Sequence, residues 1–564
     1  MLSSRKYGWE LLCAGFLLLI LYFRVTRGLD FTDEMQYYGE IRGLMETGKL
    51  FSNDLFIQQN VYIIFYPFLY GYHALFGLDG LVFFGRLLLA LICIAVYVYA
   101  SRKLFLFGCT RPVAAIAALS LTFSMPFHGV FALSYNTVSQ ALWIVYLIRF
   151  YEWRKHGVVL WAAIVLITML AHPTAAVVMG ALLVARMALE RDLTRVWRFV
   201  LAGLIGSAIL AIVLLMFAPV QQYLSALSFS SGYGVGSVFF HNRNGPVTLI
   251  AVLVMFALGY RQSLRPDGIN VSLFLIGALV LALVLLSGGQ IPGGYSGQLV
   301  LLLGAIGALG CAATCAVTGA ATGIKRPPKS GATSFHTGWL VLAILLCMTN
   351  MGVTSGNGIG QATGALMICL PILLALSTRA GTYPDLSARP ALGHLPLLLT
   401  LAIFVVHWCN FPYREVAWWR ATEAIHDIPA FRFVNTSAQR NAVLQVLHTD
   451  LSPVTQNRKV LYVSDMPILY LTLAAQPETC MLFMHSLTSP KSQNALMDCM
   501  AHRSPDLVLE LYASETPSQD NLYIRGVMRT YYASRGFRCD DKVLDFGDQL
   551  EVRPRQIKYR QCVI

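Results

Sequence analysis

"FFGRLLLALICIAVYVYASRKLF", residues 83–105, decides the fold class of this chain. Between Arg86 and Arg102 it carries no charged side chain. Because a helix needs about 20 apolar residues to cross the hydrocarbon core of a bilayer, the stretch predicts a membrane span. Similar apolar runs recur from Trp9 to Asn410, and only 13% of the 564 residues are charged, against about 25% in soluble domains. The sequence therefore predicts a polytopic α-helical membrane protein.

The apolar runs form thirteen candidate spans. They cover residues 8–24, 80–100, 112–131, 137–151, 158–171, 173–188, 196–217, 246–260, 270–287, 298–318, 338–352, 362–378 and 394–410. Because their number is odd, the termini are expected on opposite sides of the membrane. From residue 411 the composition becomes that of a soluble domain. Two parts are therefore predicted, a transmembrane part (1–410) and a C-terminal α/β domain (411–564).

The formal net charge of +13 is concentrated in the transmembrane part. Residues 1–410 hold 25 Lys and Arg against 13 Asp and Glu, whereas residues 411–564 hold 17 against 16. Of the 25 basic residues, 19 fall in segments on the N-terminal side, which the positive-inside rule makes cytoplasmic. This topology explains the basic charge without a nucleic acid partner, and it places the C-terminal domain on the outer face.

The first outer loop, residues 25–79, contains the acidic stretch "LDFTDEMQYYGEI" at 29–41. In this topology the loop holds every outward-facing carboxylate of the transmembrane part, and the other six face inward. The seven are Asp30, Asp33, Glu34, Glu40, Glu46, Asp54 and Asp79. Outer-face chemistry that uses a carboxylate of the transmembrane part therefore depends on this loop.

A helix is predicted over residues 33–47 of the loop. Thr32 has the position of an N-cap, and Gly48 is typical of a helix end. Asp33 and Glu34 suit the positive end of the helix dipole. One apolar stripe is formed by Met35, Tyr38, Ile41, Leu44 and Met45. Such a helix can lie on the membrane with its acids solvated, so the local pattern supports a structural and a functional interpretation equally.

A cytoplasmic start, one span, and an outer loop with Asp-Glu before aromatic residues resemble the GT-C superfamily of membrane glycosyltransferases. Protein O-mannosyltransferases and the lipid A aminoarabinose transferase have similar arrangements. The resemblance implies a polyprenyl-phosphate sugar as donor, and a catalytic base at Asp33 with Glu34 as its companion. "MQYYGEI" resembles the family's helix along the membrane surface, and its Tyr37 is a candidate substrate-binding residue. "FIQQNVYIIFYP" (56–67) departs from the aminoarabinose transferases, which carry Lys-Pro near this point.

Transfer from a lipid phosphate needs a base, groups that stabilise the leaving phosphate, and an apolar groove. Besides Tyr37, the candidate substrate-binding residues are Asp54, Arg86, His172, His241 and Arg243. Arg86 can instead lock the loop to the second span through Asp79 or Asp54. His172 can be structural at the helix break "AHPTA" (171–175), and Arg243 can reach lipid headgroups. "SYN" (134–136) adds hydroxyl and amide groups without an assigned role.

The C-terminal domain alternates helical and strand patterns. Expected are a membrane-surface helix in "REVAWWRATEAI" (414–425), strands in "KVLYVSD" (459–465) and "DLVLELY" (506–512), a helix in "NLYIRGVMRTYYASRG" (521–536), and a closing strand pair in "KVLDFGDQLEVRP" (542–554). Four cysteines of this domain face an oxidising compartment, and they allow three pairings. We favour Cys480–Cys499 and Cys539–Cys562. The domain is expected to recognise the acceptor or to cover the active cleft.

The leading interpretation is an inverting glycosyltransferase that moves a sugar from a polyprenyl-phosphate donor onto an envelope lipid, glycan or protein. A bacterial inner membrane with a periplasmic C-terminal domain is the expected setting. Some GT-C enzymes use a divalent metal, but no ligand set for one is visible here. Two alternatives stay open. A transporter or flippase of lipid-linked sugars would place ionisable residues at mid-membrane, and a non-catalytic scaffold would keep the architecture alone.

Overall fold

The structure, a computed structural model, describes residues 8–125, 130–231, 417–482, 490–511, 519–545 and 556–563, with isolated positions between 340 and 405. Within this part the chain is mostly helical. Three helices are long and apolar enough to cross a membrane, namely α1 (Gly8–Thr26), α4 (Leu81–Leu106) and α9 (Leu193–Phe217). The expected spans between 246 and 410 lie outside the described residues, apart from those isolated positions.

Shorter helices occupy the other expected spans of the first 231 residues. They are α5 (Arg111–Ser124), α6 (Tyr135–Tyr151), α7 (Val158–Ala171) and α8 (Pro173–Leu189), followed by α10 (Val220–Ser231) and with the 3-10 turn η4 (Trp153–Lys155) after α6. The helix break predicted at "AHPTA" is confirmed, because α7 ends before His172 and α8 begins with Pro173. Proline suits the first helical position, where its missing N–H has no partner to lose.

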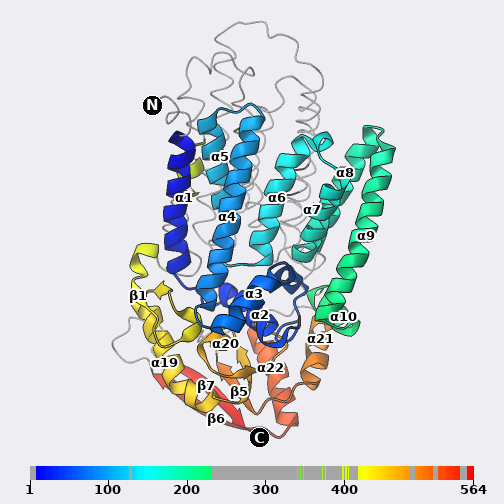
Figure 1. Cartoon of the computed structure of the whole chain (residues 1–564). Helices are drawn as coiled ribbons and strands as arrows, with labels where there is room; N and C mark the ends of the chain where they lie inside the picture. The colour runs from blue at the N-terminus through cyan, green and yellow to red at the C-terminus, as the bar shows by residue number, and fades with distance from the viewer. Residues whose placement is uncertain are drawn as a thin grey trace.

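The apolar helices stand side by side, with the C-terminal domain gathered at one end of them (Figure 1). The helix α4 packs against α1, α5 and α6, and α7 packs against α8 and α9. The short helices α2 (Asp33–Thr47), α3 (Tyr66–Phe76) and the 3-10 helix η2 (Ile57–Phe65) lie between the two parts (Figure 1). This arrangement sandwiches the acidic first loop between the apolar helices and the C-terminal domain.

The C-terminal domain contains a five-stranded sheet of order β4-β3-β5-β7-β6. β3 (Lys459–Ser464) is parallel to β4 (Gln476–Pro477) and β5 (Leu507–Leu511), and β7 (Gln556–Val563) is antiparallel to β5 and β6 (Arg538–Asp545). Five of the six β3 side chains are buried, as expected for a strand covered on both faces. The helices are α19 (Ala438–Thr455), α20 (Leu469–Thr472), α21 (Pro490–Ala501) and α22 (Gln519–Ser534).

The two central strands, the helix at 521–536 and both disulfides are confirmed. The closing strand pair also forms, but its arms are β6, which shares residues 542–545 with the expected stretch, and β7, which begins after that stretch. The membrane-surface helix expected at 414–425 is wrong for residues 417–425. They form the 3-10 turn η5 (Trp418–Arg420) and the strand β1 (Glu423–Ala424), which pairs with β2 (Asn435–Thr436). A further 3-10 turn, η6 (Pro429–Phe431), lies between β1 and β2.

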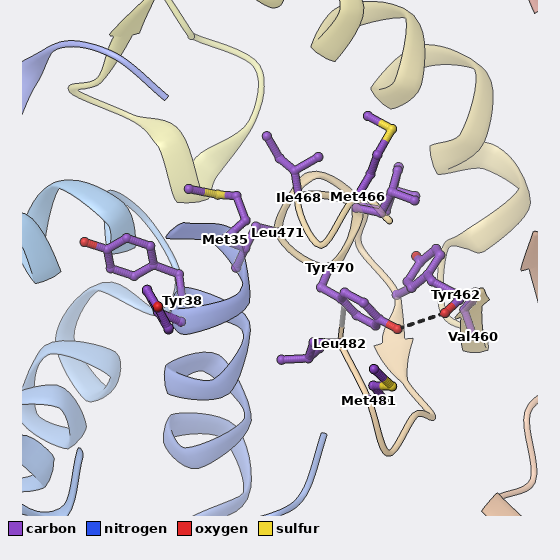
Figure 2. Close-up of a cluster of buried hydrophobic side chains, with 14 of the residues drawn as sticks. Met35, Tyr38, Val460, Tyr462, Met466, Ile468, Tyr470, Leu471, Met481 and Leu482 are labelled. Carbon is purple, nitrogen blue, oxygen red and sulfur yellow. Dashed lines mark hydrogen bonds between the residues drawn. The ribbon is translucent and has the colours of Figure 1, made fainter. Parts of the chain in front are cut away.

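The predicted helix α2 is confirmed from Asp33 to Thr47, and Gly48 ends it in the left-handed conformation at φ 67°. Glycine adopts this conformation without steric strain. The alternative in which the acids of α2 are solvated is wrong for Glu34 and Glu40, which are 2% and 4% exposed. Figure 2 shows Met35 and Tyr38 of α2 beside side chains of the segment 460–482, and these residues belong to one buried cluster. The C-terminal domain therefore covers one side of α2.

Candidate functional site

The start of α2 is held by Asp30 instead of Thr32. The side chain of Thr32 makes no capping hydrogen bond to the helix. Asp30 Oδ2 accepts from the backbone N–H of Glu34 at 3.0 Å, and its Oδ1 accepts from the N–H and the hydroxyl of Thr32. Burial raises the pKa of Asp30 to about 6, and the charge of Asp33 adds to the effect. A carboxylate thus fills the capping role predicted for a hydroxyl.

Glu34 forms a buried ion pair with Arg86 of α4. The guanidinium donates Nε to Oε1 at 2.7 Å and Nη2 to Oε2 at 2.8 Å, and the two residues are 2% and 3% exposed. Arg86 Nη2 also donates to the carbonyl of Gly28 at 2.7 Å. Such a two-pronged pair fixes both position and orientation. Arg86 therefore holds the first loop against α4, as one interpretation of the sequence predicted. Its partner is Glu34 instead of Asp79 or Asp54.

The expected partners of Arg86 have other contacts. Asp79 forms an ion pair with Arg432, and Asp54 accepts a hydrogen bond from Gln36. The Arg86 guanidinium is meanwhile surrounded by Glu34 and by backbone carbonyls of the chain after α1. Through these contacts Arg86 positions α2. They favour a structural role for Arg86 over the phosphate-binding role that the sequence suggested.

Asp33 differs from every other carboxylate of the loop. It is half-buried, and within the described part of the chain its side chain makes no hydrogen bond or ion pair with another residue. The other six loop carboxylates each accept at least one hydrogen bond. A carboxylate without a partner, held at a rigid helix start, is free to accept a proton from a bound group.

Hydroxyl and amide groups lie beside Asp33. Tyr37, one helical turn further on, accepts a hydrogen bond from Asn136 Nδ2 at 3.2 Å and packs edge-on against Tyr135, with ring centroids 6.0 Å apart. Burial, the charge of Tyr135 and the charge of Asp33 raise the pKa of Tyr37 well above its usual value. Sequence reasoning left Tyr135 and Asn136 without a role, although "SYN" at the start of α6 was the signal. Ser134 caps this helix by accepting from the N–H of Thr137.

A second group of carboxyls is fully buried. Asp54 is 0% exposed, and its Oδ2 accepts from Gln36 Nε2 and from the N–H of Leu482, both at 3.3 Å. Gln36 Nε2 also lies 3.5 Å from Glu40 Oε1. Burial raises the pKa of Asp54 to about 7. Asp54 was predicted as a substrate-binding residue, and the structure places it in this buried group.

The remaining candidates are spread along the chain. His172 lies between α7 and α8, where its Nδ1 is 3.0 Å from Thr174 Oγ1. Burial lowers the pKa of His172 to about 4, so its imidazole is neutral near pH 7. His241 and Arg243 lie outside the described residues. Within the described ranges, no group of three or more His, Cys, Asp or Glu side chains has the geometry of a metal site.

Comparison with known proteins does not assign a family. No family model matches the chain, and a search of curated proteins finds no match. The functional interpretation therefore depends on the residues around Asp33 and on the resemblance noted from the sequence.

Proposed function

We propose that this chain is an integral membrane glycosyltransferase of the GT-C type. It would move a sugar from a polyprenyl-phosphate carrier onto an envelope lipid, glycan or protein, with Asp33 as the catalytic base. The observation that carries the proposal is the isolation of Asp33. It is the loop carboxylate that has no partner in the described part of the chain, and it sits at the start of a buried helix.

The proposed reaction assigns a role to each neighbour of Asp33. Asp33 accepts the proton of an acceptor hydroxyl, whose oxygen then attacks the anomeric carbon of the donor sugar. The bond from that carbon to the phosphate oxygen breaks, and the lipid phosphate leaves from the opposite face with inversion. Glu34 acts as a positioning residue through Arg86. Tyr37 and Asn136 supply hydroxyl and amide groups of the kind that bind sugar hydroxyls.

The finer topology belongs to the same proposal. It comprises thirteen spans in a bacterial inner membrane, a cytoplasmic N-terminus and a periplasmic domain at 411–564. Two observations support the orientation. Basic residues concentrate on one side of the apolar runs. The C-terminal domain carries two disulfides, which persist in oxidising compartments. His241 and Arg243 stay the predicted binders of the donor phosphate.

The proposal is tested by mass spectrometry of envelope glycolipids and glycans. Cells without the protein are compared with cells that make the wild type, Asp33→Asn or Glu46→Gln at matched membrane abundance. Glu46 is the control because it lies on the same helix and pairs with Arg42 at its surface. We expect one sugar increment to disappear equally in the Asp33→Asn cells and in the cells without protein, and to persist with Glu46→Gln.

Two outcomes would contradict the proposal. If Asp33→Asn retains the sugar increment, Asp33 is not the base. If no envelope sugar differs between wild-type cells and cells without the protein, a transferase role fails, and a transporter or a scaffold becomes the better interpretation. Purified wild type and Asp33→Asn, assayed with a polyprenyl-phosphate sugar, then separate loss of transfer from loss of transport.

A further inference from the structure

Glu40 and Asp54 form a pair of buried carboxyls on either side of one amide group. Gln36 Nε2 lies 3.5 Å from Glu40 Oε1 and 3.3 Å from Asp54 Oδ2. The two acids are 4% and 0% exposed, and among the described residues Asp54 Oδ1 has no hydrogen-bond partner. Two unprotonated carboxylates at this separation, away from water, would repel each other strongly.

No cation neutralises this pair within the described part of the chain. On α2 the cation is Arg42, whose guanidinium is bound to Glu46 and to the carbonyls of Tyr470 and Ala475. Arg503 of the C-terminal domain donates to the carbonyl of Ser52 and to Cys480 Sγ. The other titratable groups with a described electrostatic interaction with the pair are tyrosines whose pKa burial raises, and these are Tyr37, Tyr62, Tyr135 and Tyr470. A proton is therefore the available neutralising charge.

The pair lies where three segments meet. Glu40 is on α2, Asp54 is in the chain between α2 and η2, and the N–H of Leu482 in the C-terminal domain donates to Asp54 at 3.3 Å. A Cβ on Gly39 would lie 2.9 Å from Leu482 Cδ1, so the leucine packs directly on the backbone of α2. The charge state of the pair therefore acts on the contact between the helix and the C-terminal domain.

We propose that Glu40 and Asp54 retain a shared proton near neutral pH and form a pH-dependent joint between α2 and the C-terminal domain. Gln36 and Leu482 donate N–H groups to the carboxyl oxygens, which favours one ionised carboxylate and acts against the larger effect of burial. Loss of the last proton leaves two negative charges that these neutral donors cannot offset, and the joint weakens. The proposal does not depend on sugar transfer.

The direction of the pH effect follows from proton binding. In the unfolded chain both carboxyls ionise near pH 4. In the folded chain burial raises the pKa of Asp54 to about 7, and burial together with the charge of Asp54 raises that of Glu40 well above its usual value. The folded state then binds more protons than the unfolded state, so stability falls as pH rises through this range. The pH-dependent loss of stability that comes from Asp30, whose pKa is about 6, occurs mostly at lower pH.

The test measures the Tm of the full chain in lipid nanodiscs between about pH 6.5 and pH 9, with its disulfides intact. The wild type should lose several degrees across this range. Glu40→Gln, which keeps the shape of the protonated acid, should lose less than the wild type, because Asp54 still titrates without repulsion from Glu40. Glu40→Gln with Asp54→Asn should show little change. Glu46→Gln is the matched control on the same helix and should keep the wild-type slope, because Glu46 is partly exposed and paired with Arg42.

Infrared spectroscopy keeps the proposal testable even if a variant does not fold. At about pH 7.5 the wild type should show a protonated carboxyl band that fades at higher pH and is missing from the double variant. A wild-type spectrum without this band overturns the proposal, and so do equal Tm slopes in the wild type and Glu40→Gln. A Ca²⁺-dependent rise in Tm that the double variant loses would also overturn it, because a cation would then neutralise the pair.

Discussion

Breaking the ion pair between Glu34 and Arg86 should destabilise the junction between α2 and α4 severely. Arg86→Met would leave the Glu34 carboxylate buried, since Glu34 is 2% exposed. Within the described residues its remaining hydrogen-bond donor would be the N–H of Asp30, 3.2 Å from Oε2. It would also remove the donor from the Gly28 carbonyl. Removing one partner of a buried pair costs about 3–5 kcal/mol, and we expect the loss for Arg86→Met within that range.

The coupling between the two residues separates this explanation from a simple loss of packing. Glu34→Leu combined with Arg86→Met removes both charges, so the double variant should lose clearly less stability than the sum of the single variants. Free energies of unfolding from denaturant titrations in mixed micelles measure this difference. Additive losses, or a loss below about 1 kcal/mol for Arg86→Met, would refute the reasoning, because a buried unpaired carboxylate cannot be that well tolerated.

Three further changes test other contacts of α2 by the same measurement. Arg42→Leu removes a buried guanidinium that donates to two carbonyls of the C-terminal domain, and should cost about 3 kcal/mol. Gly85→Ala places a Cβ 2.3 Å from the Tyr38 ring, and should cost about 1–3 kcal/mol; an unchanged stability would mean that the ring moves freely. Asp30→Ala should cost about 1–2 kcal/mol and Thr32→Val less, because Asp30 accepts the helix N–H. The reverse order would restore Thr32 as the cap.

Local chemistry was enough to predict the elements that depend on neighbouring residues. α2 runs from Asp33 to Thr47 as predicted, because Gly48 ends it and no residue inside it breaks it. The strand at 459–464 and the break at His172 follow from equally local signals. Both disulfides also agree with the sequence interpretation. For the helix, the strand and the break, the deciding residues lie within or beside the element itself.

The contacts of the site could not be predicted in the same way. Arg86 lies 52 positions from Glu34, and Leu482 lies 428 positions from Asp54. Nothing in the local pattern distinguishes Glu34 from Asp33, because both sit in the first turn. The membrane-surface helix failed for a similar reason, since residues 423–424 pair with 435–436 and the ladder outweighs helix propensity.

The polar pattern of α2 nevertheless contained a signal that it is not a surface helix. An amphipathic helix places its polar residues on one side. Successive residues advance by about 100° around a helix, so Glu34, Gln36, Glu40 and Arg42 fall on several sides of α2. Each of these positions is buried and finds a different polar partner. A helix with polar residues on several sides needs such partners once it is buried. Asp33 is the loop carboxylate whose side chain has no partner among the described residues. It is therefore the first residue to test for a catalytic role.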